Sequence, residues 1–196
     1  MIPRRFPQSG WVEVVTGCMF SGKTEELIRR LNRARYAKLE VVVFKPSVDV
    51  RYAVADVVSH SDERIPCKPV KTAGDILRNV GTASVVGIDE AQFFDASLVD
   101  VVNRLADEGR RVVVAGLDQD FRGRPFEPIP QLMAIAEYVD KTLAVCMVCG
   151  APANRSQRMV HRESQVLLGA AEVYEARCRA HWDPDTFDAR QEELPL

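Results

Sequence analysis

The 196-residue sequence predicts an α/β domain of three layers, in which helices cover a mainly parallel sheet, with a small metal-binding subdomain appended. Three observations lead to this fold class. Short β-branched apolar runs alternate with helical patterns, a glycine-rich loop follows the first run, and a C-x-x-C pair opens a region of different character near residue 145. Strand–helix–strand alternation with short connections is typical of parallel sheets with helices on both faces.

The expected strands are short and nearly continuous in apolar residues, as in sheets that are buried on both faces. They occupy residues 11–16, 40–46, 83–89 and 110–118. Helical spacing of apolar residues predicts helices between them, at 24–36, 96–108 and 129–137. Gly109 is expected to end the second helix, because glycine readily adopts the left-handed conformation found there.

Composition excludes several classes of protein. Hydrophobic residues make up 46% and charged residues 28% of the chain, as in soluble globular proteins. A net charge of −2 argues against a nucleic-acid surface spread over the whole domain. No apolar run approaches the roughly 18 residues that span a membrane, and the first ten residues lack the apolar core of a secretory signal. We therefore expect a cytoplasmic enzyme or binding protein without a nucleic-acid or membrane partner.

The stretch Gly17-Cys18-Met19-Phe20-Ser21-Gly22-Lys23-Thr24 matches the pattern G-x-x-x-x-G-K-[ST] in full, between an expected strand and an expected helix. Its glycines let backbone N–H groups curl around an anion, and the following helix N-terminus favours negative charge. Lys23 is predicted to reach the β- and γ-phosphates, and the Thr24 hydroxyl to ligate Mg²⁺. The alternative is a glycine-rich turn with a chance lysine.

A carboxylate pair ends the third expected strand. Asp89 and Glu90 lie where α/β folds bind ligands, at the carboxyl end of a strand. Asp89 is predicted to hold Mg²⁺ through a water molecule, and Glu90 to accept a proton from an attacking hydroxyl. The pair alone does not separate a kinase from an ATPase that activates water, and Glu90 could also be a surface acid.

Four metal-ligand residues follow, as Cys146-x-x-Cys149 and Cys178-x-x-His181. Two pairs of ligands suit a tetrahedral Zn²⁺ site closed by protein, which is structural rather than catalytic. The loop between the pairs would be clamped at its base and free at its tip. Two unrelated cysteine clusters are the alternative.

Aromatic and basic residues are interleaved in residues 116–128, which are rich in turn formers. Phe121 and Phe126 could stack on a base beside the phosphate site, a contact that contributes roughly 1–3 kcal/mol per base. Core aromatics beside a surface loop explain the same pattern equally well.

Together these motifs resemble the type II thymidine kinases. "TGCMFSGKTEEL", "DEAQFF", "GLDQDFRGRPF", "AVCMVCG" and "YEARCRAH" occur in the family's order and at similar spacing, from about Gly10 to Trp182. The resemblance implies a RecA-like P-loop domain with a zinc-bound lasso subdomain, usually in homotetramers. It implies ATP-dependent phosphorylation of the 5′-hydroxyl of thymidine, and of deoxyuridine, in nucleoside salvage, with dTTP as feedback inhibitor.

Site residues carried over from this resemblance fall into three sets. ATP and Mg²⁺ would bind at Gly17–Thr24 and at Asp89, Glu90, Ala91 and Gln92, with Glu90 as the catalytic base. The nucleoside would contact Met19, Asp49, Arg51, Gln92, Leu117, Phe121, Phe126, Val166, Leu167, Leu168, Gly169 and Tyr174. Zinc would bind at Cys146, Cys149, Cys178 and His181. One departure is Gly169-Ala170, where family members commonly carry two glycines.

The expected organisation has four parts: a flexible N-terminus (1–10), a P-loop kinase domain (11–144), a zinc-binding lasso subdomain (145–182) and a flexible tail (183–196). Two other functions fit the residues less well. One is a P-loop ATPase or switch whose zinc module binds a partner, and the other is a binding module without catalysis. The residues alone lead to a magnesium-nucleotide phosphotransferase with structural zinc, and the acceptor comes from the resemblance.

Overall fold

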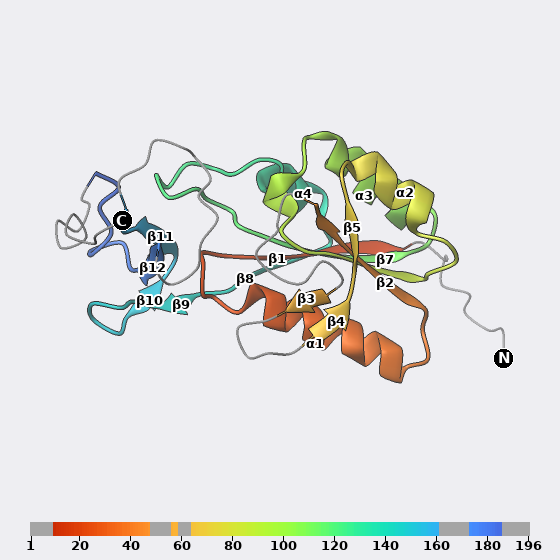
Figure 1. The fold of residues 1–196 in the computed structure, drawn as a ribbon, viewed down its shortest axis with the longest axis horizontal. Coiled ribbons are helices and arrows are strands. Elements are labelled where there is room, and N and C mark those ends of the chain that lie inside the picture. The colour runs from red at the N-terminus through yellow and green to blue at the C-terminus, as the bar shows by residue number, and fades with distance from the viewer. Residues whose placement is uncertain (1–9, 48–55, 59–63, 161–172, 186–196) are drawn as a thin grey trace, which may run out of the picture.

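The computed structural model describes residues 10–47, 56–58, 64–160 and 173–185 (Figure 1). Six strands form one parallel sheet in the order β5-β2-β6-β7-β1-β8. Their bounds are β1 Trp11–Thr16, β2 Val41–Pro46, β5 Lys68–Val70, β6 Val85–Ile88, β7 Arg111–Gly116 and β8 Tyr138–Lys141. The helices are α1 Lys23–Tyr36, α2 Ala73–Asn79, the 3₁₀ turn η1 Ala91–Phe93, α3 Ser97–Asp107 and α4 Ile129–Ile135.

Helices cover both faces of the sheet, with α1 on one side and α2, α3 and α4 on the other (Figure 1). Alternating side chains of β1 show how the strand serves both layers. Val12 and Val14 pack in the cluster that contains α2, α3 and α4, whereas Val15 packs with Leu27 and Leu31 of α1. The predicted three-layer α/β class with a parallel sheet is therefore confirmed.

The predicted helix at 129–137 is wrong at its end, since α4 stops at Ile135. Ala136 is extended, with ψ of 140°, and β8 begins two residues later. The carboxylate of Glu137 accepts a hydrogen bond of 2.6 Å from the Val12 backbone N–H. A contact across 125 positions of sequence draws this residue to the sheet, so helical spacing did not mark the boundary.

Helix α2 and strands β5 and β8 were not expected. Helix α2 begins with a capping box, in which the Thr72 side chain accepts from the Asp75 N–H while Asp75 accepts from the Thr72 N–H. Strand β8 has the sequence YVDK and its four residues are all exposed. It was not predicted because it lacks the continuous apolar run of a buried strand. Strand β5 contains Pro69 and lies at the opposite edge of the sheet, where a missing N–H is tolerated.

Short antiparallel pairs complete the described part of the chain. Strand β3 (Asp56–Val58) pairs with β4 (Arg64–Pro66), β9 (Ala144–Val145) with β10 (Pro152–Ala153), and β11 (Arg155–Arg158) with β12 (Tyr174–Arg177). The last two pairs lie together beyond one end of the sheet (Figure 1). No helix within the described ranges is long and apolar enough to cross a membrane.

Candidate active site and metal centre

The glycine-rich loop joins β1 to α1, as its sequence pattern requires. Gly17 has φ of +146°, and a Cβ there would lie 2.2 Å from the Thr142 carbonyl oxygen. Gly22, the residue that caps α1, has φ of +81°. Both positions therefore demand glycine, because a side chain would be strained at either and would also clash at Gly17. Lys23 then begins a helix of 14 residues, whose N-terminal N–H groups favour an anion.

Lys23 and Thr24 lie close to the carboxylate pair Asp89 and Glu90. The Lys23 ammonium donates a 2.7 Å hydrogen bond to the Cys18 carbonyl oxygen. Burial lowers the pKa of Lys23, and the Glu90 carboxylate is the strongest of the nearby charges that oppose this shift. Thr24 Oγ1 donates to Asp89 Oδ2 over 3.5 Å. The loop, Asp89 and Glu90 thus share one side of the molecule, at the carboxyl ends of β1 and β6.

Glu90 is held in an uncommon backbone conformation. Its φ of 51° and ψ of 41° are left-handed, where a non-glycine residue is disfavoured. Gln92, which is 3% exposed, donates from Nε2 to Glu90 Oε2 and accepts at Oε1 a 3.0 Å hydrogen bond from the Leu117 N–H. Gln92 therefore orients the Glu90 carboxylate and ties the end of β6 to the end of β7.

The aromatic residues of 116–128 occupy different environments. Phe121 is only 5% exposed, whereas Phe126 is half-buried. Phe126 meets Phe93 edge-on, with ring centroids 6.4 Å apart and an interplanar angle of 87°. Phe93 lies in η1, directly after the carboxylate pair and Gln92. Phe93 therefore joins the residues of 116–128 to the turn that follows Glu90, a contact that the sequence did not indicate.

The loop also contacts the appended subdomain. The Met19 N–H donates to Ser156 Oγ over 3.0 Å, and the Cys18 thiol donates to the Ala153 carbonyl oxygen over 3.3 Å. Sequence reasoning missed Ser156, because nothing local distinguishes it and only the tertiary fold brings it 137 positions back to the loop. A further unexpected group is Asp118, a buried carboxylate at the end of β7 that pairs with Lys141 of β8.

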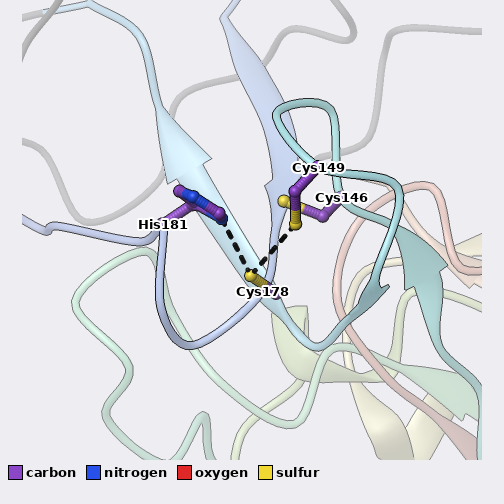
Figure 2. Close-up of side chains that lie close together, drawn as sticks. All are labelled: Cys146, Cys149, Cys178 and His181. Carbon is purple, nitrogen blue, oxygen red and sulfur yellow. Dashed lines mark hydrogen bonds between the residues drawn. The ribbon is translucent and has the colours of Figure 1, made fainter.

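Cys146, Cys149, Cys178 and His181 converge as predicted, with one ligand atom of each lying within 4.8 Å of all the others (Figure 2). Tetrahedral zinc with bonds of about 2.3 Å to sulfur places two thiolates about 3.8 Å apart. The sulfurs of Cys149 and Cys178 are 3.8 Å apart, and Cys178 Sγ is 3.2 Å from His181 Nδ1. The donor set and its spacing therefore fit zinc.

The ionisation of Cys146 also suits a metal ligand. Burial by itself raises the pKa of this thiol, but hydrogen bonds from backbone groups of Cys178, Val148 and Cys149 outweigh it and lower the pKa to about 6. A hydrogen bond to the Ala151 backbone lowers the pKa of Cys149, but burial, hydrogen bonds with the Cys146 and Cys178 thiols and the Cys146 charge outweigh it, so the pKa is raised. A cluster that stabilises one thiolate before a metal binds is prepared for a cation.

Several predicted contact residues fall outside the described ranges, namely Asp49, Arg51, Val166, Leu167, Leu168 and Gly169. Tyr174 is described: it is buried in β12 and pairs across the hairpin with Arg158 of β11. Met19 and Leu117 are half-buried near the loop and the end of β7. Asp183, at the start of the expected tail, exchanges two hydrogen bonds with Gln157, of 2.7 and 2.9 Å.

A parallel α/β sheet whose first strand leads through this loop into a helix, with paired carboxylates beside the loop, is the arrangement of P-loop nucleotide-binding proteins. Comparison with known proteins narrows this class. A family model described as thymidine kinase matches residues 10–182. The chain is also 58% identical to a thymidine kinase from Rhodothermus sp. (strain ITI 518), over 94% of this chain and 86% of that one. The chain belongs to the thymidine kinase family and is an enzyme.

Among solved structures, domain III of the replication initiation protein DnaA from Thermotoga maritima matches with a TM-score of 0.42 and 15% identity. The match covers 70% of this chain and 57% of that one. A likeness at this level is too low to carry an argument about fold or function.

Proposed function

We propose that the chain transfers the γ-phosphate of ATP to the 5′-hydroxyl of thymidine, giving dTMP. One observation carries this proposal: Lys23, Asp89 and Glu90 meet beside a glycine-rich loop that ends in a helix N-terminus. Such a site can hold a triphosphate and place a proton acceptor next to it. The family match and the named relative support thymidine as the acceptor.

The catalytic work follows from the positions of the side chains. Residues Gly17–Thr24 would cradle the phosphates, with Lys23 exchanging its Cys18 carbonyl partner for a phosphate oxygen. Glu90 would accept the proton of the 5′-hydroxyl in the orientation that Gln92 imposes. The unusual backbone of Glu90 supports this role, because strain of this kind gathers at functional sites.

Thr24 and Asp89 would hold Mg²⁺. Their side-chain oxygens are 3.5 Å apart, and hydroxyl and carboxylate oxygens are the donors that this cation prefers. When bound, the ion neutralises developing charge on the phosphate oxygens. Ala91 follows Glu90 into η1 and is fully buried in the apolar core, so we propose that it contributes to this site by anchoring the backbone next to Glu90.

We propose a division of roles between residues 11–144, which bind the nucleotide, and residues 145–182, which close the acceptor pocket. Hydrogen bonds from Met19 and Cys18 to the appended subdomain support this division. We propose that the walls of the acceptor pocket are formed by Leu117, Phe121, Phe126 and Tyr174. Zinc would clamp the base of the appended subdomain. Discrimination among pyrimidines then comes from pocket groups that the wrong base leaves unpaired.

A direct test is incubation of the purified chain with γ-labelled ATP, Mg²⁺ and a panel of nucleosides. We expect label in dTMP, and also in dUMP when deoxyuridine is offered. Transfer to neither nucleoside would reject the proposal. ATP hydrolysis without an acceptor, stimulated by DNA or protein, would instead favour a P-loop ATPase or switch.

We also propose feedback inhibition by dTTP, which can place its thymidine moiety in the acceptor pocket and its phosphates on the glycine-rich loop. Such an inhibitor competes with both substrates, because it spans both subsites. Initial rates at varied thymidine and varied ATP check this. A dTTP effect that neither substrate overcomes would contradict the proposed mode of binding.

Finally, we propose that the chain self-associates, as a homotetramer. Exposed apolar side chains on β8 and the segment after it support a contact surface between copies, namely Tyr138, Val139, Leu143, Val145, Met147 and Val148. Strand β8 is also an edge of the sheet, with backbone groups available for pairing. Light scattering measures the mass directly, and a monomer at micromolar concentration would reject this part.

A further inference from the structure

Arg158 has no role in the site as described above, yet it is the largest of the fully buried side chains in the described part of the chain. Only 1% of this residue is exposed. Removing a guanidinium from water is costly, and the cost is offset only by well-formed contacts. Arginine almost never occupies such a position unless it is paired. Its contacts therefore indicate what the residue does.

The Arg158 guanidinium contacts two aromatic residues from different parts of the chain, Phe121 and Tyr174. Its central carbon lies 3.5 Å from the centroid of the Phe121 ring, which is direct stacking on the ring face. Arg158 Nη2 also donates a 2.7 Å hydrogen bond to the Tyr174 hydroxyl, and the Tyr174 ring centroid is 5.3 Å away. The guanidinium thus joins Phe121, which follows β7, to Tyr174 on β12.

The hairpin geometry fixes this arrangement. Arg158 and Tyr174 are directly opposite each other in the β11–β12 ladder, so their side chains leave the same face of the hairpin. The Phe121 backbone is held from the same subdomain, since Trp182 Nε1 donates to the Phe121 carbonyl oxygen over 3.3 Å. The position of the Phe121 ring is therefore set by the appended subdomain rather than by the sheet.

Phe121 consequently does not present two open faces for a base. Arg158 covers one face, Arg122 lies 5.1 Å from the ring centroid, and the residue is 5% exposed. The Phe121 ring can therefore contribute to base binding mainly through its position, and its buried partners determine that position. We propose that Arg158 is a positioning residue for the nucleoside: it holds Phe121 and Tyr174 at the spacing that the acceptor base requires. The inference rests on the proposed function.

Substitution by lysine tests the stacking. Lysine keeps the positive charge but has no planar group to stack on Phe121 while bonding to Tyr174. We expect Arg158→Lys to raise the KM for thymidine by about tenfold and the KM for ATP by less than about twofold. Arg104→Lys is the matched control, because the Arg104 side chain is 67% exposed on α3. Equal thymidine KM values in both variants would overturn the inference.

A second variant covers the case in which lysine prevents folding. Arg158→Met removes the buried charge with similar volume, a change that is often neutral for stability. We expect normal zinc content and the same selective rise in thymidine KM. A Met variant with wild-type thymidine KM would overturn the inference, whatever the lysine variant does.

An equilibrium measurement separates this inference from the proposed reaction. In a Trp11→Phe background, Trp182 reports on the Phe121 backbone to which it is bonded. We expect thymidine to change its fluorescence, with a midpoint about tenfold higher after Arg158→Lys. Thymidine binding with this shift but without phosphate transfer would reject the proposed function and retain the role of Arg158. A midpoint that does not shift would overturn the role of Arg158 while leaving the reaction intact.

Discussion

The sheet domain and the appended subdomain are stabilised in different ways. In the sheet domain, branched apolar side chains such as Leu31, Leu105 and Val114 are fully buried between the sheet and its helices. The buried apolar cluster at the subdomain contains only small side chains among the described residues: Cys146, Ala153, Ala176 and Cys178 of the subdomain, with Cys18 and Ala144 of the sheet domain. Such a cluster removes little apolar area from water, so we expect a metal at the Cys/His cluster to supply the stability that packing does not.

In the sheet domain, burial therefore predicts which side chains matter for stability. In the appended subdomain it does not. Cys149 and His181 are exposed, yet both point at the metal centre (Figure 2). The two regions nevertheless meet at the glycine-rich loop, where Cys18 belongs to the small cluster and Lys23 to the proposed phosphate site. Loss of the metal should therefore alter the acceptor side of the site before it unfolds the sheet.

The largest effect on stability is expected when a cysteine of the candidate metal centre is replaced, in comparison with a buried cysteine of the sheet domain. Cys149→Ser, at an exposed ligand, should abolish the binding of about one zinc per chain and unfold the subdomain, since structural zinc contributes about 10–16 kcal/mol. Cys67→Ser, at a buried position beside α1, should keep its zinc and cost about 1–3 kcal/mol. Metal analysis and urea unfolding check both. Retained zinc in the Cys149 variant would refute the contrast between the regions.

Second in size is the loss of the proposed base. Glu90→Gln should lower kcat by about 10²–10⁴, because the amide cannot accept the hydroxyl proton, while ATP still binds and the zinc content stays unchanged. Glu108→Gln, an exposed acid beyond α3, is the control. Single-turnover rates with labelled ATP measure the change. Near-normal turnover would remove Glu90 from this role.

A core substitution tests the packing of the sheet domain. Leu31→Ala should lower the free energy of unfolding by about 2–5 kcal/mol, because a fully buried side chain in the α1 layer leaves a cavity. The change should leave zinc affinity unaltered, as the two cores are separate. If chelator titration shows zinc weakened to the same extent as the sheet, the regions unfold as one unit and the comparison fails.

The smallest effect is electrostatic and depends on pH. Hydrogen bonds, first from Arg29 at 2.6 Å and then from Arg30 at 2.7 Å, lower the pKa of Glu26 to about 2. A folded pKa below the ordinary value of 4.5 stabilises the fold above pH 4.5, and this contribution is lost as the pH falls towards 2. Glu26→Gln should therefore cost about 1 kcal/mol at pH 7 and less at pH 3. Urea unfolding at both pH values provides the check, and an equal cost at each would contradict the assignment.

Most of the sheet and much of the candidate site could be predicted locally. The runs at 11–16 and 110–118 predicted β1 and β7, because strands buried on both faces are apolar throughout. The glycine pattern predicted a loop that only glycine can form at residues 17 and 22. The exposed strand β8 and the end of α4 were beyond this kind of reasoning, since backbone pairing and the distant contact of Glu137 decide them.

The sequence by itself predicted the parallel α/β class, the glycine-rich loop, the carboxylate pair beside it and the cluster of four cysteine and histidine side chains. The loop, the carboxylate pair and each half of the Cys/His cluster are short patterns that neighbouring residues make recognisable, and the fold class follows from the alternation of strands and helices. Only the tertiary structure decided that Ser156 meets the loop, that Gln92 orients Glu90 and that Arg158 joins Phe121 to Tyr174. The physical reason is that the position of a buried polar side chain depends on the groups that it contacts. When these groups are far apart in the sequence, they come together only when the whole fold forms.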